Sequence, residues 1–475
     1  MKIKPLFLLI SVLISSQIYA DELDDALGGF DEPSNSSNST ELDDILDGFD
    51  EPSSDATASL EPQLETIENV VSVSGYYGFS SSYNYAHSTP ASGEVDYQGL
   101  SKLKFSANIM SDFEVNADWK ARVELKLFAD TIYSLNDRDE YNDDILDTYE
   151  SDIAFNEVYI SGSLTEAFDL KFGRQIVVWG KSDNIRVADM INPLDNREPG
   201  MVDIEDLRIP VLMTKLSYYS GDWSYTLMAI HEQRNPIEAA IDSEFFPTAA
   251  LPFSANFVLP DVGEGDIDFA ESTFAFSADG RFSGWDLSLY AARVTDSRWH
   301  FEENKTVRDY GLIDMTGVAG NVVLNGFLLK AEVALIDNLV YNTTTDKKSR
   351  TDSLIGVEYM GITDWTLSAE YAIRKIDDYE TQMINSPDMV EETSSQLSLR
   401  ASYSFDHDNA TLSFLNTALG DGGEQGGFNR LWLDYAINDQ LELSTGVIDY
   451  QSGTNLIWNA ISDNDRLFFN ARYNF

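Results

Sequence analysis

Apolar and polar residues alternate with a period of two along most of the chain after about Val70. In residues 365–374 every second residue, starting with Trp365, is apolar, and the residues between them are polar or small. Windows at 119–127 and 397–405 repeat the pattern. Successive side chains of a β-strand point to opposite faces, so this alternation predicts strands with one apolar and one polar face.

Short turns and long loops alternate between these windows. We place short turns near 111–112, 164–167, 220–222, 279–284, 317–321, 361–364, 405–409 and 437–440. We place long loops near 87–96, 131–150, 181–207, 235–265, 298–305, 339–350, 378–391, 421–427 and 452–463. The fold class is therefore all-β: an antiparallel transmembrane β-barrel of about 18 strands (16–18 allowed) over residues 69–475, with both chain ends on the short-turn side.

Aromatic residues near strand ends and the C-terminal pattern favour a membrane barrel over a soluble sandwich. The strand-end aromatics are Trp223, Trp285, Trp365, Tyr403 and Phe405, where an interfacial girdle is expected. In the last strand every second residue is apolar, and the strand ends on an aromatic residue. This pattern resembles the signal that such barrels present to the barrel-insertion machinery. Its aromatic positions are Phe469, Tyr473 and Phe475. This strand is also expected to pair with the first one and leave no backbone edge in lipid.

The N-terminus reads as a targeting segment followed by an acidic leader. Residues 1–20 have a basic start, an apolar middle and a cleavage-like end, which predicts a secretory signal peptide. Residues 21–68 contain sixteen Asp and Glu residues and no Lys or Arg. So charged a segment, poor in bulky apolar groups, cannot offset its ordering entropy, and we expect a disordered periplasmic leader.

The leader contains a duplicated motif, at residues 22–33 and again at 41–52. Each copy spaces its apolar residues to suit one helical turn, which predicts docking peptides for a periplasmic partner. The docking residues are Leu23, Leu27 and Phe30 in the first copy and Leu42, Leu46 and Phe49 in the second. The alternative is a spacer that keeps the barrel soluble before insertion.

Charge and residue counts exclude several function classes. The formal net charge is −50, which argues against nucleic-acid binding because that relies on Lys and Arg neutralising phosphates. The chain has no cysteine, which excludes disulfides and thiolate metal sites, and its four histidines lie in no metal or nucleophile motif. We expect no metal, no cofactor and no enzymatic activity. The expected surroundings are the lipid and lipopolysaccharide of the outer membrane of a Gram-negative bacterium.

Charged residues of both signs fall on the polar face of several predicted strands. These candidate pore-lining residues are Lys120, Arg122, Glu124, Lys126, Glu370, Arg374, Arg400 and Arg472. They fit a water-filled lumen, since closed barrels of about 16–18 strands leave an aqueous channel. Such charges can instead pair across the wall or hold an inserted loop.

The segment from Phe172 to Pro210 is the least generic part of the sequence. A mobile external loop would rarely contain so many apolar residues, so we expect residues 181–208 to pack inside or across the barrel mouth as a constriction or gating loop. The alternative is a loop folded onto the outer rim. Its candidate residues are Arg174, Trp179, Lys181, Arg186, Asn192, Asp195, Arg197 and Arg208.

The run Gly-Arg-Gln-x-Val-x-Trp-Gly at 173–180, followed by Ile-Asn-Pro-Leu-Asp at 191–195, resembles the proteobacterial barrel family catalogued as domain of unknown function 1302. The duplicated leader motif is similar to leaders of such proteins. The resemblance is strongest over 172–210. It implies an outer-membrane channel or transporter and no known catalytic residues.

Three classes of function follow. The first is a porin-like channel that moves a small or hydrophobic solute, with residues 181–208 as its constriction. The second is a non-transporting surface barrel, acting as an adhesin, a receptor or a scaffold for a periplasmic export partner, and the third and weakest is an outer-membrane hydrolase. The sequence leaves open the solute, the direction of transport and whether the protein is a monomer or a trimer.

Overall fold

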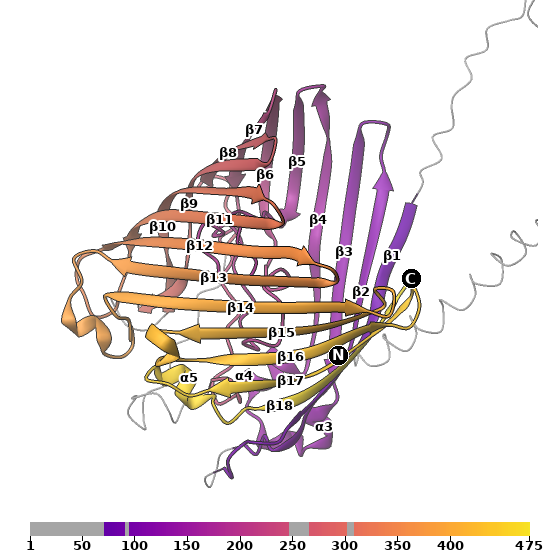
Figure 1. The fold of residues 1–475 in the computed structure, drawn as a ribbon, viewed down its shortest axis with the longest axis vertical. Helices are drawn as coiled ribbons and strands as arrows, with labels where there is room; N and C mark the ends of the chain where they lie inside the picture. The colour runs from indigo at the N-terminus through magenta and orange to yellow at the C-terminus, as the bar shows by residue number, and fades with distance from the viewer. Residues whose placement is uncertain (1–70, 91–94, 247–265, 302–307) are drawn as a thin grey trace, which may run out of the picture. The chain divides into compact units, whose positions relative to one another are not determined.

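The computed structural model describes residues 71–90, 95–246, 266–301 and 308–475. Within them, eighteen strands form one antiparallel sheet whose neighbours follow the chain order (Figure 1). The strands are β1 Val71–Asn84, β2 Gly99–Glu114, β3 Trp119–Asp130, β4 Ser151–Thr165, β5 Phe168–Gln175, β6 Val211–Ser220, β7 Trp223–Ile230, β8 Thr273–Phe282, β9 Trp285–Phe301, β10 Arg308–Leu324, β11 Phe327–Leu339, β12 Lys348–Ile362, β13 Trp365–Ile376, β14 Thr393–Phe405, β15 Ala410–Leu419, β16 Gly426–Ala436, β17 Leu441–Gln451 and β18 Arg466–Asn474.

The last strand closes the sheet on the first. Residues 76–84 of β1 pair with residues 466–474 of β18 in antiparallel register. Beyond the strand end, the Phe475 amide donates to the Gly75 carbonyl at 3.0 Å, and the Gly75 amide donates back at 3.1 Å. The Phe475 ring also stacks on Tyr77 with centroids 4.9 Å apart. The predicted closed barrel of eighteen strands is confirmed, and the aromatic C-terminus is part of its seam.

The predicted alternation of short turns and long connections also holds, with two turns misplaced. The turn expected near 111–112 follows β2 at residues 115–118, and residues 317–321 lie within β10. The turn after β10 is the pair Asn325-Gly326, with φ of 48° and 86°. Positive φ at both positions suits a two-residue hairpin, and the glycines upstream misled the prediction because Gly317 and Gly320 lie in extended strand instead.

Strand β11 turns apolar side chains outward and carries buried charged side chains on its inward face. On β11 the outward side chains of Leu329, Val333 and Leu335 are exposed, while the inward Lys330 and Glu332 are 7% and 1% exposed. The burial pattern alternates without a break through most of this strand. Such an inside-out arrangement is the reverse of a soluble protein, in which charged groups face water.

Aromatic residues gather at the ends of the strands that carry the short turns. Trp365 of β13 stacks on Tyr403 of β14 at 4.9 Å, and Phe282 of β8 stacks on Trp285 of β9 at 4.2 Å. Trp223 begins β7, and it packs edge-on against Phe282 at 5.7 Å. The predicted strand-end aromatics therefore lie at one end of the barrel, which we call the short-turn end.

The opposite end, the long-connection end, carries the short helices of the described residues. These are α3 Ile132–Leu135, η2 Arg138–Glu140, α4 Asp143–Tyr149, η4 Thr381–Ile384, η5 Asp421–Gly423 and α5 Leu456–Ala460. Among the described residues no helix is long and apolar enough to cross a membrane. The signal peptide and the acidic leader with its docking motifs lie outside the described residues.

Candidate functional site

Residues 176–210, which join β5 to β6 and which we call the inner loop, pack against the inward face of the barrel wall. Its buried side chains include Val177, Trp179, Ile185, Val187 and Ile191. They form one apolar cluster with inward residues of β6 to β13, which we call the covered wall. Members of the covered wall are Val211, Met213, Met228, Ile230, Ala275, Tyr290, Val294, Ile313, Met315, Ala334, Ile336, Leu354 and Ala372. Each large apolar side chain buried in this way contributes about 1.5–3 kcal/mol before the cost of ordering the loop.

Two carboxylates of the covered wall hold the backbone of the inner loop. Glu332 of β11 accepts hydrogen bonds from the amides of Lys181, Ser182 and Ala188. Glu370 of β13 accepts from the amides of residues 183 and 184 at 2.8 and 2.9 Å. An ionised carboxylate acts only as a hydrogen-bond acceptor, and backbone amides satisfy its lone pairs without a cation. Glu370, predicted to line the pore, therefore anchors the loop, one of the alternatives considered for the lumen charges.

The Asn192 side chain joins the beginning and the end of the inner loop by hydrogen bonds. Its side-chain oxygen accepts from the Val177 amide at 2.8 Å, and its amide nitrogen donates to the carbonyls of Gln175 and Ile209 at 3.3 and 2.8 Å. Nearby, the ring of Trp179 stacks on Tyr290 of β9 with centroids 4.7 Å apart. The two predicted loop residues Asn192 and Trp179 are thus buried structural contacts.

The far part of the inner loop reaches strands on other sides of the barrel. Glu198 pairs with Lys102 of β2. Asp203 pairs with Arg430 of β16 at 2.8 Å and with Arg400 of β14 at 3.8 Å. The Tyr450 hydroxyl of β17 donates to the carbonyl of residue 199 at 2.7 Å. A connection that leaves the wall at β5 therefore contacts β2, β11, β13, β14, β16 and β17 before it returns to β6.

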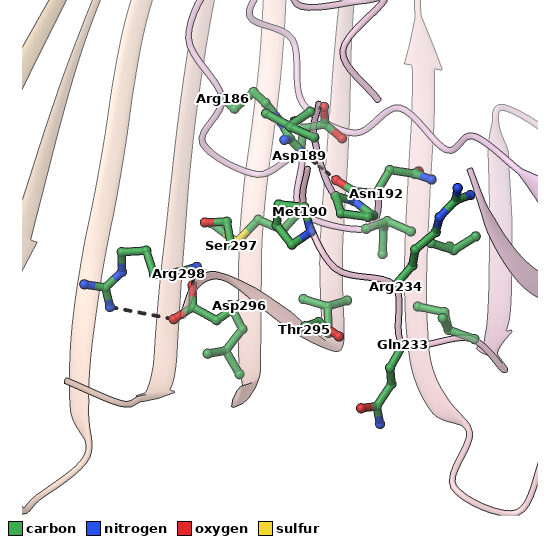
Figure 2. A pocket seen from close by; sticks show the side chains of 18 of the residues that line it. Arg186, Asp189, Met190, Asn192, Gln233, Arg234, Thr295, Asp296, Ser297 and Arg298 are labelled. Carbon is green, nitrogen blue, oxygen red and sulfur yellow. Dashed lines mark hydrogen bonds and ion pairs between the residues drawn. The ribbon is translucent and has the colours of Figure 1, made fainter. Parts of the chain in front are cut away.

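A cavity of about 420 Å³ lies between the inner loop and the long-connection ends of several strands (Figure 2). We call it the arginine cavity. Its five arginines come from five segments: Arg186 from the inner loop, Arg234 from the β7–β8 connection, Arg298 from β9, Arg350 from β12 and Arg374 from β13. Its carboxylates are Asp189, Glu232, Asp296 and Asp352. Its apolar lining includes Met190, Ile191, Val211, Ile230, Val294 and Ile313.

Burial acts differently on the loop arginines according to their partners. Burial lowers the pKa of Arg186 and Arg234, although the nearby Asp189 and Glu232 act in the opposite direction. Burial also disfavours the charged form of Arg197, but the hydrogen bonds from its side chain to Asp195, at 2.8 and 2.6 Å, outweigh it and raise its pKa. The carboxylates around Arg186 and Arg234 therefore do not fully compensate for their desolvation.

The predicted pore-lining residues of β3 occupy the inward face and take different partners. Lys120 lies at the short-turn end, exposed, 3.6 Å from Glu114. Arg122 makes two hydrogen bonds to Asp112, at 2.7 and 2.8 Å. Glu124 is buried and accepts from the side chains of two asparagines, at 108 and 156. Lys126 is half-buried and follows on the same face.

The remaining predicted wall residues are spread over the barrel. Arg374 donates to Gln396 of β14 and to the Arg186 carbonyl, both at 3.2 Å. Arg472 lies at the short-turn end, exposed, where it donates to the side chain of residue 474 and lies over the Tyr76 ring at 4.0 Å. The eight predicted residues thus do not form one site.

Three further predicted loop residues also have defined partners. Arg174 makes two hydrogen bonds to Glu232, at 3.0 and 2.7 Å, and lies on the face of β5 opposite the buried Gln175. Arg208 donates to Asp189 at 2.8 Å. Lys181 donates its backbone amide to Glu332.

Several residues of the site were missed from the sequence. Glu332, Arg350 and Asp352 are charged residues at inward positions, so the alternation already indicated their face. Nothing local indicated that Glu332 binds amides about 150 positions earlier in the chain. The loop residues Arg234 and Glu232 gave no periodic signal at all. Within the described part of the chain, no group of three or more His, Cys, Asp or Glu residues is arranged to hold a metal ion.

Comparisons with known proteins match most of the chain to one protein family. The family model "Protein of unknown function (DUF1302)" matches residues 58–475, well beyond the segment 172–210 that carried the resemblance. No curated protein sequence matches the chain significantly.

Three of the similar solved structures come from Acinetobacter baumannii and Pseudomonas aeruginosa. OccAB2 of Acinetobacter baumannii is 9% identical, with a TM-score of 0.49 over 85% of this chain and 98% of its own. OccK8 (OprE) of Pseudomonas aeruginosa is 9% identical, with a TM-score of 0.48 over 86% and 98%. The outer membrane channel DcaP of Acinetobacter baumannii is 10% identical, with a TM-score of 0.43 over 85% and 97%. We carry no functional detail from them to this chain.

Proposed function

The chain belongs to the DUF1302 protein family, and from that premise and the interior geometry we propose that it is an outer-membrane channel of a Gram-negative bacterium. In this proposal the inner loop narrows the lumen, with residues 181–208 as the constriction, and a small or hydrophobic solute passes beside it. We assign the protein no catalytic role.

The membrane location is supported by the outward face of the strands. Large apolar side chains are exposed there around the wall, for example Phe155 on β4, Phe274 on β8 and Ile355 on β12, at 56%, 60% and 66%. Water would make such a surface unfavourable, whereas lipid tails match it. The closed hydrogen-bonded sheet also leaves no unpaired strand edge, as a protein in lipid requires.

An even number of antiparallel strands, short turns at one end and long connections at the other are typical of bacterial outer-membrane barrels. In this family of architectures the short turns face the periplasm. The inner loop and the arginine cavity then lie toward the cell exterior, and both ends of the barrel domain face the periplasm. The insertion machinery, lipopolysaccharide and a leader-binding periplasmic partner remain predictions.

The observation that carries the channel proposal is the path of the inner loop. A barrel of about 16–18 strands is wide enough for an aqueous channel, and a segment that crosses its interior sets the width of what remains. The loop is fixed at one side by Glu332 and Glu370 and at another by Arg430 through Asp203. A constriction held at both sides gives a defined cross-section.

Single-channel conductance in planar bilayers tests this proposal. The mature protein is expected to give stable steps, and replacing residues 182–207 by a short Gly-Ser linker is expected to increase their size at least twofold. A second variant, Glu332→Ala with Glu370→Ala, keeps the chain length and is expected to make the current noisy by loosening the loop. Its matched control is Glu442→Ala, at an exposed position of β17. Equal steps with and without the loop would contradict a constriction by that segment.

One observation favours a second function, that of a non-transporting scaffold. Other connections add to the interior contacts, since Glu244 of the β7–β8 connection binds Arg466 of β18 at 2.9 and 3.1 Å. A lumen closed by these segments would conduct no ions. The absence of conductance both in the mature protein and in the loop-replaced variant would support the scaffold and reject the channel.

A further inference from the structure

We propose that the arginine cavity is a binding site for an organic acid, whose carboxylate binds Arg186 and Arg374 and whose apolar body packs against the apolar lining of the cavity. As the substrate class of the channel, this inference rests on the proposed function. As a binding site, it stands on the geometry below.

Three of the four carboxylates of the cavity are already occupied by other donors, and the fourth, Asp296, lies 3.6 Å from Arg298. Asp352 receives two hydrogen bonds from Arg350, at 2.7 and 2.8 Å. Glu232 receives two from Arg174 and a third from a backbone amide. Asp189 receives one from Arg208 and one from the Trp179 amide. These carboxylates have little capacity left for the other arginines of the cavity.

Four guanidinium groups consequently have no carboxylate bound in bidentate fashion among the described residues. Arg234 donates to the Pro210 carbonyl at 3.0 Å. Arg374 donates to a glutamine and a carbonyl, and its Nε lies 3.8 Å from an oxygen of Asp352. The Nε of Arg186 lies 3.2 Å from Asp189 and forms an ion pair without hydrogen-bond geometry, while its Nη2 donates to the Asn192 carbonyl at 3.0 Å. Arg298 lies 3.6 Å from Asp296 and 4.1 Å above the Tyr341 ring, and its Nε and Nη2 make no hydrogen bond within the described structure.

Buried donors without acceptors are costly, and a bound carboxylate supplies acceptors of the matching shape and charge. An unsatisfied buried polar group costs about 1–3 kcal/mol, and a planar guanidinium binds a carboxylate through two parallel hydrogen bonds. The arginines would also be unusual as plain structural contacts here. The whole chain carries 81 acidic and 31 basic residues, yet this cavity has more arginines than carboxylates. An acidic protein that concentrates basic groups in one cavity provides a local field for an anion.

The apolar part of the cavity lining determines which kind of molecule can carry the bound anionic group. The apolar lining comprises Met190 and Ile191 of the inner loop together with Val211 of β6, Ile230 of β7 and Val294 of β9. These side chains offer dispersion contacts and no hydrogen bonds, so they suit an aromatic or aliphatic body. A cavity of about 420 Å³ is within the usual range for small-molecule sites, roughly 300–1,000 Å³. A small hydrophobic monocarboxylate matches both the arginines and the apolar lining, whereas an inorganic anion would make no use of the apolar lining.

Equilibrium binding of benzoate to the purified full-length mature protein in detergent tests the inference, with benzamide as the neutral isostere. We expect saturable binding of benzoate and at least tenfold weaker binding of benzamide. Arg186→Gln and Arg374→Gln are each expected to weaken benzoate binding about tenfold or more, the change expected from losing a charge-assisted hydrogen bond. The matched control is Arg138→Gln, which removes an arginine paired with Glu150 outside the cavity and should leave benzoate affinity unchanged.

Each outcome decides between the two proposals. Equal affinity for benzoate and benzamide in the wild-type protein would overturn the inference, and this comparison needs no variant to fold. Unchanged benzoate affinity in folded Arg186→Gln and Arg374→Gln would overturn the assignment to this cavity. Conductance without selective benzoate binding would leave the channel standing and remove the anion site. Selective benzoate binding without conductance would support the anion site and reject the channel.

Discussion

Two regions of the inner wall, built from the same alternating strands, carry opposite kinds of side chain. The covered wall, on β6 to β13, presents mainly apolar residues such as Met213, Met228 and Met315. The inward face of β2 and β3, which we call the charged wall, presents Asp112, Arg122 and other charged or polar residues. Inward position alone therefore does not determine polarity. The apolar residues lie where the inner loop covers the wall.

The charges of the two walls also work differently. On the covered wall, Glu332 is 1% exposed and binds three backbone amides of the inner loop. On the charged wall, Arg122 and Asp112 bind one another and their side chains remain about one third exposed. A buried carboxylate with fixed donors is costly to remove, whereas a partly exposed ion pair contributes little. The comparison can be tested by removing the buried carboxylate of the covered wall and the ion pair of the charged wall in turn.

The largest effect is expected from Glu332→Ala on the covered wall. The substitution leaves the amides of Lys181, Ser182 and Ala188 without their acceptor, and we expect the free energy of unfolding to fall by roughly 3–5 kcal/mol. Urea unfolding in detergent measures it, together with faster proteolysis within the inner loop. Glu442→Ala is the control, with an expected change below about 0.5 kcal/mol. A change in Glu332→Ala as small as in the control would show that these amides find other partners.

A smaller, pH-dependent effect is expected at the contact between the inner loop and β2. Burial raises the pKa of Glu198, but Lys102 and Lys104 outweigh burial and lower this pKa from 4.5 to about 2. The folded-state pKa lies below the unfolded one, so the stabilisation is fully present above about pH 4.5 and is lost as pH falls through about 2.

Comparison of the wild-type protein with Glu198→Gln measures this effect. The wild type is expected to be more stable by about 1–3 kcal/mol near neutral pH, and the difference should shrink progressively between about pH 4.5 and 2. Glu205→Gln, at an exposed position of the same loop, should show no such trend. A stability difference that is constant over this pH range would reject the Lys102–Glu198 contact as its cause.

The smallest effect is expected on the charged wall. A double-mutant cycle with Arg122→Gln and Asp112→Asn should give a coupling energy of about 0.5–1 kcal/mol, because the pair is partly exposed and screened by water. The coupling should decrease with added salt. A coupling as large as the loss in Glu332→Ala would erase the distinction between the two walls.

Most of the fold could be predicted from the sequence because its signals are local. Alternation gave the strands and their inward positions, so Arg122 and Glu370 were placed on the correct face. Turn residues located most connections. The error at residues 317–321 arose because glycines are common in turns, although Asn325-Gly326 is the stronger hairpin signal. The number of strands followed from counting the connections.

The site was predicted only in part. The apolar content of residues 181–208 indicated that this connection packs against other parts of the protein, and Ile185 and Val187 are each 1% exposed. The roles of individual side chains did not follow. Asn192, a candidate residue of the constriction loop, instead joins the beginning and the end of that loop by hydrogen bonds, and the arginine cavity takes its arginines from five segments separated along the chain.

The sequence by itself determined which residues form strands and which side of each strand faces inward, because a strand alternates its side chains every two residues whatever lies beyond it. Only the tertiary structure decided which inward charges hold the loop, which pair with each other and which surround the arginine cavity. The reason is distance along the chain: Glu332 binds amides 144 to 151 residues away, and no local pattern specifies such a partner.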